Sequence, residues 1–270
     1  MIINIMDSFK NIIYEKSNGV ATITLNRPNK YNALTIELLT ELREAMTDVY
    51  DDNAIRVVIL TGKGKGFCSG GDLRTVDERT RPDGVDHEEE RKFHKIATDA
   101  FESLEKCPKP FIVAVNGLAI AAGFEMCLWA DLVIASEDAR IGDAHANYML
   151  FGPKSVNFLP RQIGLKKSME LLFTRDVWKA KDMEKLGLVN KVVPAGRLME
   201  EAHEMAAKIA EKSPLSSKYI KSAVKQALQA PVDAVNSYAF AIVDIIAKSK
   251  DRAEGVKAFT EKRKPNFTGE

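Results

Sequence analysis

The sequence predicts an α/β core followed by a helical region at the C-terminus. Short apolar runs of strand length alternate with stretches of helical periodicity as far as Pro194. After Pro194 the strand-like runs stop and only amphipathic helical stretches follow. We therefore expect a core domain over residues 1–196 and a helical region over 197–270, with helices at roughly 197–212, 215–229, 232–248 and 251–263.

The composition is that of a globular chain that folds without disulfide bonds. With 270 residues, of which 45% are hydrophobic, the chain can bury a sizeable core. Its three cysteines, Cys68, Cys107 and Cys127, form no Cys-x-x-Cys pair, which argues against a redox site, a zinc site or a disulfide framework. We expect a reducing, cytoplasmic setting and no bound metal.

The charge distribution argues against nucleic acid and membranes as partners. Acidic and basic residues nearly balance, at a formal net charge of +1, and they are scattered along the chain. No broad positive field is therefore expected to attract a polyanion or an anionic membrane. The apolar start, Met1 to Ile5, is interrupted by Asp7 and Lys10 before it reaches the length of a signal or membrane segment.

The first elements of the core are a strand and a helix. Residues Val20 to Leu25 alternate in polarity and are rich in β-branched side chains, which predicts a strand. Thr35 is placed to cap a helix that ends near residues 51–53. Apolar residues recur along this helix at its 3.6-residue period, and they predict its buried face: Leu38, Leu39, Leu42, Ala45, Met46 and Val49.

The next strands are continuous apolar runs at 55–60 and 111–115. Such runs are typical of strands that are covered on both faces. Between them, residues 74–90 are charged and are expected to form a mobile loop leading into a helix over about 88–106. The remaining core elements are expected at 132–136 (strand), 166–173 (helix) and 188–193 (strand).

A glycine-rich loop follows the strand at 55–60. Five of the ten residues from Gly62 to Gly71 are glycine. Glycine permits positive φ and close approach of the backbone, so this loop could direct bare amides at an anion or a carbonyl oxygen. The loop matches neither the Walker nor the dinucleotide-binding pattern. On this segment alone, a plain surface turn is the alternative.

A second segment joins a buried strand to an apolar helix. The strand ends at Asn116 and Gly117, and small residues then open a helix that contains Glu125. The N–H groups of a first helical turn have no intrahelical acceptor and lie at the positive end of the dipole, so they can bind a developing oxyanion. Neighbours such as Phe124 and Trp129 argue against a solvated face, so Glu125 is expected to be a poised acid or base.

Together these two segments resemble the signature of the crotonase superfamily, which is the enoyl-CoA hydratase/isomerase family. The motifs that carry the resemblance are Phe67-Cys-Ser-Gly-Gly-Asp-Leu73 and Asn116-Gly-x-Ala-x-x-Ala-Gly-x-Glu125. Four further stretches are similar to the family, so the resemblance spans about residues 12–267: Leu25 to Leu34, Ala130 to Ser136, Gly187 to Pro194 and Phe259 to Phe267.

The resemblance implies a crotonase-like β-β-α spiral core with a C-terminal helical trimerisation region. The implied assembly is a homotrimer or a homohexamer, in which the C-terminal helices complete neighbouring sites. The implied substrate is an acyl-CoA thioester, with coenzyme A as part of the substrate and no prosthetic group.

The resemblance also implies the catalytic residues. The two oxyanion-hole amides fall on Gly71 and Ala122, and one catalytic glutamate falls on Glu125. The position of the second glutamate falls on His145, which is a departure from the family pattern. An imidazole works as an acid or a base near neutrality, so His145 either replaces the carboxylate or only lines the pocket. A second departure is the bulky stretch from Phe151 to Phe158, where hydratases have a glycine-rich run in the wall of the acyl pocket.

Five other residues are expected on the coenzyme A side of the site: Arg27, Gly70, Asp72, Phe259 and Lys262. Arg27 is a candidate for the coenzyme's phosphates, and Asp72 is expected to fix the glycine-rich loop by accepting backbone hydrogen bonds. In the family, the residues that match Phe259 and Lys262 contact coenzyme A bound to a neighbouring subunit.

These features predict an enzyme that stabilises a thioester enolate, with hydration of an enoyl-CoA by a hydro-lyase as the leading reaction. Isomerisation would use one acid–base group to move a proton between carbons. The alternative is a hydrolase that breaks a carbon–carbon bond in cyclic or β-dicarbonyl substrates, because ring-opening relatives of crotonase use histidine near this site. Cys68 is expected to be a buried thiol and not a nucleophile, since no histidine is adjacent in sequence.

Overall fold

The computed structural model describes residues 9–74, 80–81, 84–85, 87–148 and 151–270. The apolar start at Met1 to Ile5 lies outside these ranges, as does part of the expected loop over 74–90. The described parts of that loop include two short paired strands, β5 (Thr80–Arg81) and β6 (Gly84–Val85).

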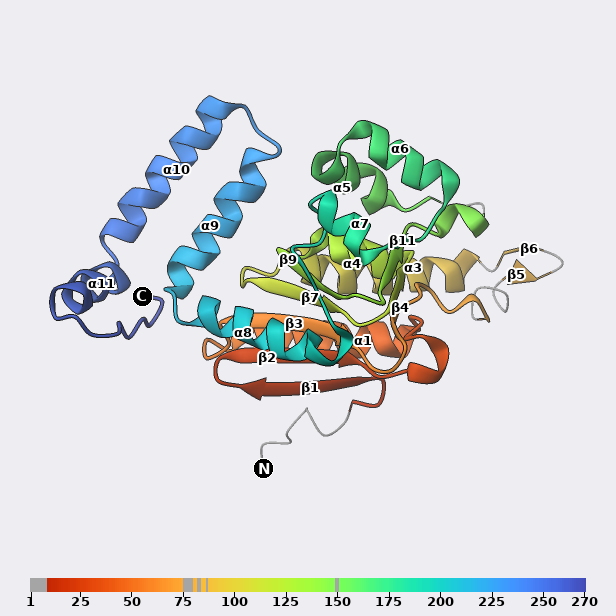
Figure 1. Cartoon of the computed structure of the whole chain (residues 1–270), viewed down its shortest axis with the longest axis horizontal. Helices are drawn as coiled ribbons and strands as arrows, with labels where there is room; N and C mark the ends of the chain where they lie inside the picture. The colour runs from red at the N-terminus through yellow and green to blue at the C-terminus, as the bar shows by residue number, and fades with distance from the viewer. Residues whose placement is uncertain (1–8, 75–79, 82–83, 86, 149–150) are drawn as a thin grey trace.

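The core is built on a six-stranded sheet in the order β1-β2-β3-β7-β9-β12 (Figure 1). Only β1 and β2 pair antiparallel, and the other neighbours are parallel. The strands are β1 (Ile12–Ser17), β2 (Val20–Leu25), β3 (Val57–Gly62), β7 (Phe111–Val115), β9 (Leu132–Ser136) and β12 (Lys191–Val193).

A second, four-stranded sheet has the order β11-β10-β8-β4. Its strands are β4 (Gly66–Cys68), β8 (Leu118–Ile120), β10 (Arg140–Gly142) and β11 (Trp178–Lys179). Each of β3, β7 and β9 in the first sheet is followed by a strand of the second sheet and then by a helix. The β-β-α repeat that the family resemblance implies is therefore present.

The central strands of the large sheet are buried on both faces, as their unbroken apolar runs predict. Val58 and Leu60 of β3 belong to one hydrophobic cluster with α1 (Ile36–Asp51) and α3 (His87–Glu105). Val57 and Ile59 belong to a second cluster with α8 (Leu198–Ala210). Side chains alternate between the faces of a strand, so both clusters need apolar residues from the same run.

The helix α1 forms as its sequence predicts. The side chain of Thr35 accepts a hydrogen bond from the N–H of Leu38, at 3.3 Å, and caps the first turn. The buried residues of α1 are the six that its apolar period predicts: Leu38, Leu39, Leu42, Ala45, Met46 and Val49. Four more helices precede the C-terminal region in sequence: α4 (Ala122–Trp129), α5 (Pro153–Ile163), α6 (Leu165–Thr174) and α7 (Ala180–Lys185).

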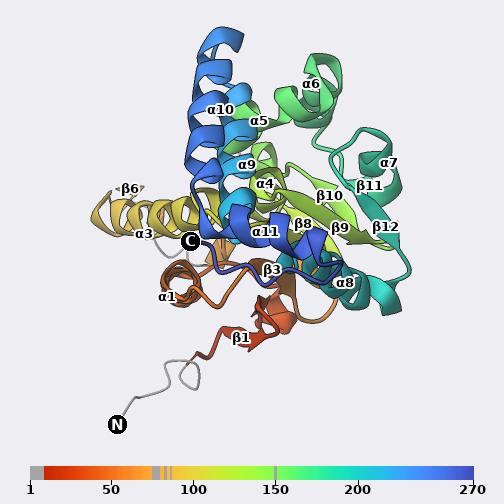
Figure 2. The ribbon, with the colours of Figure 1, turned by 90° about the vertical axis from the view of Figure 1, so that its left-hand side faces the viewer.

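The C-terminal helices differ in how they contact the core. Helix α8 packs on the large sheet through Leu198, Ala202 and Ala206, so by packing it belongs with the core, beyond the expected boundary at residue 196. The helices that follow extend away from the sheets, α9 and α10 as an antiparallel pair (Figures 1 and 2). They are α9 (Pro214–Ala227), α10 (Val232–Ala247) and α11 (Lys250–Thr260).

Candidate active site

The two glycine-containing segments that the sequence singles out lie side by side. Strands β4 and β8 pair in parallel, with Cys68 opposite Ala119. The segments that follow the two strands therefore start at the same end of the small sheet. A Cβ on Gly70 would lie 2.7 Å from Cβ of Ala121 and 3.5 Å from the backbone nitrogen of Ala122. The segments that hold Gly71 and Ala122 are therefore in contact, as the two-amide hypothesis requires.

The backbone of both segments is held in an unusual conformation. Gly70 has φ +86°, and Ala121, which precedes α4, has φ +51°, a value that non-glycine residues rarely adopt. Strain of this kind is found at binding and catalytic sites, where the surrounding structure maintains it. The conformation leaves two N–H groups, of Gly71 and Ala122, without an acceptor among the described residues. Both remain available to a ligand oxygen.

Glu125 is buried one turn into α4, where it is 4% exposed. All eight residues of this helix are buried, so the expectation that Glu125 avoids a solvated face is confirmed. Its Oε1 accepts hydrogen bonds from the N–H groups of Lys154 at 2.9 Å and Ser155 at 3.2 Å, in the first turn of α5. Burial raises the pKa of Glu125, and it outweighs the opposite effects of nearby His145 and of the two amides.

His145 begins a short 3-10 helix, His145–Tyr148, and is paired with Asp143. Both its backbone N–H and its ring Nδ1 lie 2.9 Å from Oδ1 of Asp143. Burial alone would lower the pKa of His145, but the hydrogen bond to Asp143 and the charges of Asp143 and Glu125 outweigh it and raise that pKa. Glu125 and His145 therefore lie close enough for the charge of each to shift the pKa of the other.

Three residues of this cluster are absent from the sequence predictions: Asp143, Gly152 and Ser155. A Cβ on Gly152 would lie 2.7 Å from Oε1 of Glu125, 2.7 Å from Oγ of Ser155 and 2.8 Å from Oδ2 of Asp143. The three oxygens thus surround a space that only a glycine leaves open. The sequence signals were the Asp-x-His spacing and the Gly-Pro pair that opens α5, and both acquire meaning only when the segments meet.

Comparison with known proteins identifies the family of the chain that carries this cluster. Residues 15–270 match the family described as enoyl-CoA hydratase/isomerase. The chain belongs to the enoyl-CoA hydratase/isomerase family. It is therefore an enzyme of the hydratase/isomerase type, a hydro-lyase that acts on acyl-CoA.

Relatives in this family cover almost the whole chain. The crotonyl-CoA hydratase of Syntrophomonas wolfei is 34% identical, over 96% of this chain and 98% of the relative. The (E)-benzylidenesuccinyl-CoA hydratase of Thauera aromatica is 35% identical, over 96% and 99%. The crystal structure of an enoyl-CoA hydratase from Bacillus anthracis superposes with a TM-score of 0.90 at 35% identity, covering 97% of this chain and all of that one.

The residues expected at coenzyme A fall into two groups in this family member. Arg27 pairs with Asp72 at 3.0 Å and also donates to the carbonyl of Ala33. Asp72 accepts the N–H of Arg74 at 3.3 Å, which agrees with a role in fixing the glycine-rich loop. Burial alone would raise the pKa of Asp72, but the hydrogen bonds from Arg27 and from the N–H of Arg74, together with the charges of both arginines, outweigh burial and lower that pKa. Arg27 as a phosphate ligand stays a prediction.

Phe259 and Lys262 lie far from this cluster within one chain. Phe259 is 87% exposed near the end of α11, which Figure 1 places well away from α4. A role for both residues therefore requires a second subunit, as the family resemblance implies.

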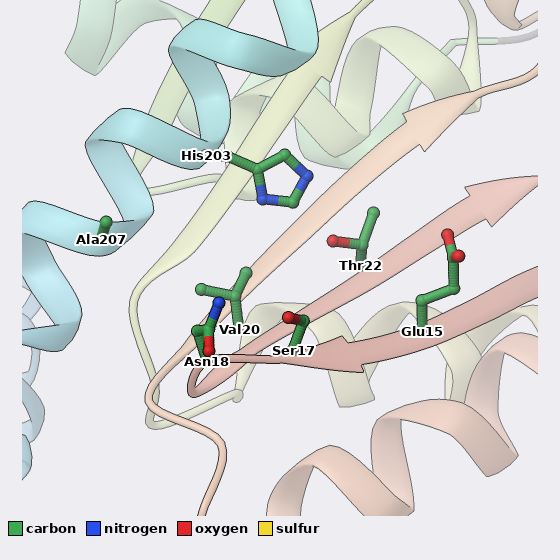
Figure 3. A pocket seen from close by; sticks show the side chains of 7 residues that line it. All are labelled: Glu15, Ser17, Asn18, Val20, Thr22, His203 and Ala207. Carbon is green, nitrogen blue, oxygen red and sulfur yellow. The ribbon is translucent and has the colours of Figure 1, made fainter.

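Other features of this family member lie outside the cluster. Burial raises the pKa of the Cys68 thiol to about 12, so Cys68 is inert at neutral pH, as expected. A cavity of about 460 Å³ opens between the β1–β2 hairpin and α8, with His203 and Glu15 in its lining (Figure 3), but none of the expected site residues lines it.

Within the described ranges, no helix is long and apolar enough to cross a membrane, and no group of three or more side chains could hold a metal ion.

Proposed function

We propose that this enzyme adds water across the double bond of 2-enoyl-CoA thioesters through an enolate. The observation that carries the proposal is the electrostatic interaction of buried Glu125 with the His145–Asp143 pair, on the helix that begins at the unsatisfied amide of Ala122. The hydratase names of the relatives support the same reaction. Coenzyme A is then part of the substrate, and the reaction needs no prosthetic group.

Each group has one step in this reaction. Glu125, as a carboxylate, removes a proton from water while the water oxygen bonds to C3. The electron pair of the double bond moves to the thioester oxygen, where the N–H groups of Gly71 and Ala122 hold the negative charge. His145, as an imidazolium, then delivers a proton to C2. Transfer of a proton from Glu125 to His145 restores the starting state.

Two substitutions test the assignment of the acid and the base. We expect Glu125→Gln and His145→Ala each to lower the turnover of crotonyl-CoA by about 10²–10⁴, the usual contribution of a positioned acid or base. Affinity for coenzyme A should change little, because neither side chain is expected to touch the coenzyme. Stopped-flow turnover and calorimetric binding of a non-reactive thioester measure the two effects. Unchanged turnover in the His145 variant would remove this residue from the reaction.

The paired histidine favours one second candidate, hydrolysis of a carbon–carbon bond in cyclic or β-dicarbonyl substrates. A histidine oriented by a carboxylate is the arrangement that activates water or a nucleophile in hydrolases. Mass spectrometry of a panel of acyl-CoA thioesters and β-dicarbonyl compounds separates the candidates, because gain of water, isomerisation and chain cleavage give different products.

The assembly that we propose is a homotrimer or homohexamer built through the C-terminal helices. Helix α10 is apolar along most of its length, yet only Ile242 is buried in the single chain. Exposed apolar side chains continue along the neighbouring helices, for example Ile220 at 63% and Val224 at 58%. A second copy of the chain would cover them and would bring Phe259 and Lys262 to a neighbouring site. A cytoplasmic location stays a prediction.

A further inference from the structure

Asp143 is the buried carboxylate that the reaction above does not use. It is 3% exposed, and its Oδ1 accepts hydrogen bonds from both the backbone N–H and the ring of His145. Its other oxygen, Oδ2, is buried near the Ser155 hydroxyl, which helps to lower the pKa of Asp143, but neither atom has a partner at hydrogen-bond distance among the described residues. Leaving a buried carboxylate oxygen so weakly paired costs free energy, so its retention needs a reason.

We propose that Asp143 is a positioning residue, which fixes the ring of His145 with Nδ1 toward Oδ1 and so makes Nε2 the atom that exchanges protons. This inference rests on the proposed function, since it names how one of the reacting groups is oriented. It adds a third member to the pair formed by Glu125 and His145.

The hydrogen bonds determine the tautomer of His145. Burial would raise the pKa of Asp143, but the hydrogen bonds and the charge of His145 outweigh burial and lower it, so Asp143 is a carboxylate at neutral pH. An ionised carboxylate only accepts hydrogen bonds, so Nδ1 of His145 must carry the proton of their 2.9 Å contact. In the neutral ring, the lone pair therefore lies on Nε2. No described residue bonds to Nε2, which leaves it free for a substrate or for water.

The backbone contact makes this orientation rigid. Because Oδ1 also binds the N–H of His145, the Asp143 side chain is fixed by the segment that it orients. The His145 side chain is 18% exposed, so it remains partly accessible while Nδ1 is held by Asp143. An imidazole with one nitrogen held by a carboxylate and the other facing a reactant has a defined direction for proton transfer.

The charge of Asp143 acts on both reacting groups. In the described part of the chain, the charges that shift His145 are Asp143 beside it and Glu125 on α4. The backbone N–H of Lys154 on α5 binds Glu125, but the charged Nζ of Lys154 pairs with Glu105 on α3, at 2.6 Å. Asp143 favours the imidazolium and disfavours the carboxylate form of Glu125, so it raises both pKa values. Removing the charge of Asp143 should therefore lower the pKa of His145 and the pKa of Glu125.

Nitrogen-15 NMR of the wild-type protein tests the tautomer without any assay of activity. With the His145 signals assigned by comparison with His145→Gln, we expect the neutral ring to carry its proton on Nδ1. A proton on Nε2 would overturn the proposal. Because this measurement uses the unaltered chain, it remains decisive even if substitutions of Asp143 prevent folding.

Asp143→Asn tests the positioning role, with Asp138→Asn as a matched control. Asp138 is an exposed carboxylate five residues earlier on the same segment, and its removal changes the net charge equally. In Asp143→Asn we expect the titration midpoint of His145 to fall, the kcat/KM profile of crotonyl-CoA hydration to shift to lower pH, and kcat to fall by about 10²–10⁴. Asp138→Asn should leave all three unchanged.

The outcomes separate this inference from the proposed reaction. A loss of activity in Asp143→Asn with an unchanged His145 titration would mean a merely structural role, and the inference would be wrong. The expected NMR results in a protein that hydrates no enoyl-CoA would uphold the orientation of His145 and contradict the proposed function instead.

Discussion

Gly70 and Gly71 are neighbours in the chain, but they differ in backbone conformation and in surrounding space. Gly70 has φ +86°, and an added Cβ would lie 2.7 Å from Cβ of Ala121. At Gly71 an added Cβ would meet no atom within 4 Å, and its φ is not positive. The first glycine is therefore required by the backbone, whereas the second supplies only its N–H group.

A pair of alanine substitutions tests this difference. We expect Gly71→Ala to keep the turnover of crotonyl-CoA within about threefold, because the oxyanion donor is a backbone group that alanine retains. Gly70→Ala should destabilise the fold by about 1–3 kcal/mol, the usual cost of a residue held at unfavourable φ, and should reduce turnover. Urea unfolding and steady-state kinetics measure both effects. Equal behaviour of the two variants would contradict the assignment of Gly71.

Gly152 is a residue whose importance comes from what surrounds it. A methyl group there would lie within 2.8 Å of oxygens of Glu125, Asp143 and Ser155, so these side chains would have to move. We expect Gly152→Ala to lower kcat by about 10² or more, since misplacing a reacting group by about 1 Å costs this much. In Gly196→Ala, where nothing lies within 4 Å of the added carbon, turnover should not change. Retention of full activity by Gly152→Ala would mean that the oxygens rearrange without consequence.

At the residue scale, the sequence predicts the parts of the site that depend on local pattern. The glycine-rich loop and the helix start predict two segments with free amides, which the family resemblance assigns to Gly71 and Ala122. The burial of Glu125 follows from its apolar neighbours. The contact of His145 with Asp143 could not be predicted, because two residues in an irregular segment adopt many relative orientations. The two hydrogen bonds of His145, from its backbone N–H and its ring, to Oδ1 of Asp143 select one of them.

At the element scale, the N-terminus of α5 shows how two elements share one group. Gly152 precedes α5 and has no side chain to cap it, so Oε1 of Glu125 accepts the N–H groups of Lys154 and Ser155 instead. The positive end of this helix therefore supports the ionised form of Glu125, while burial opposes it. The reactivity of Glu125 thus depends on the position of α5.

The C-terminal tail is a second element whose position depends on one carboxylate. Glu254 on α11 accepts two hydrogen bonds from Arg263, at 2.6 Å and 2.9 Å, and one from the N–H of Asn266 at 2.7 Å. The hydrogen bonds from Arg263 lower the pKa of Glu254 to about 2. Because the pKa of Glu254 is lower in the folded than in the unfolded chain, its carboxylate stabilises the folded state. This stabilisation is fully present above the unfolded pKa, about 4.3, and is lost as the pH falls through about 2.

We therefore expect Glu254→Gln to loosen the tail at neutral pH. Hydrogen exchange of the amides of residues 264 and 266–268 should become faster than in the wild type, and the difference should shrink as the pH falls through about 2 and vanish below it, once Glu254 is protonated. Glu261→Gln is the control, because Glu261 pairs with the same Arg263 but binds no backbone amide of the tail. If both variants exchange alike at neutral pH, Glu254 does not hold the tail.

The sequence predicts long elements better than short ones. The four C-terminal helices and the strands β2, β7 and β9 lie within three residues of the expected ranges, because each has a periodic pattern or an unbroken apolar run over at least five residues. The strands β4, β8, β10 and β11 were missed, since they are two or three residues long and carry no period of their own. Pairing in the small sheet stabilises them, which is a tertiary effect.

At the scale of the whole molecule, the arm formed by α9, α10 and α11 is incomplete in a single chain. Helix α10 carries apolar side chains along most of its length, yet Phe240 is 72% exposed and Val243 is 58% exposed. Monomeric proteins rarely leave contiguous apolar surface of this kind in water. The sequence predicts these helices and their separation from the core, but not what covers them, because amphipathic periodicity does not identify the surface that packs on a helix.

A single charge on this arm tests whether another copy of the chain covers it. We expect the wild type to have the mass of a trimer or hexamer in sedimentation velocity, and Phe240→Asp to dissociate toward monomer, because a buried unpaired charge costs several kcal/mol. The Tm of the wild type should also rise with protein concentration, as it does when subunits stabilise one another. Tyr50→Asp is the matched control, since Tyr50 is a large side chain that is 60% exposed on α1, which is not part of the arm. A wild type that sediments as a monomer would contradict both the assembly and the placement of Phe259 and Lys262 at a neighbouring site. Loss of turnover in Phe240→Asp, together with dissociation, would show that one chain alone does not complete the site.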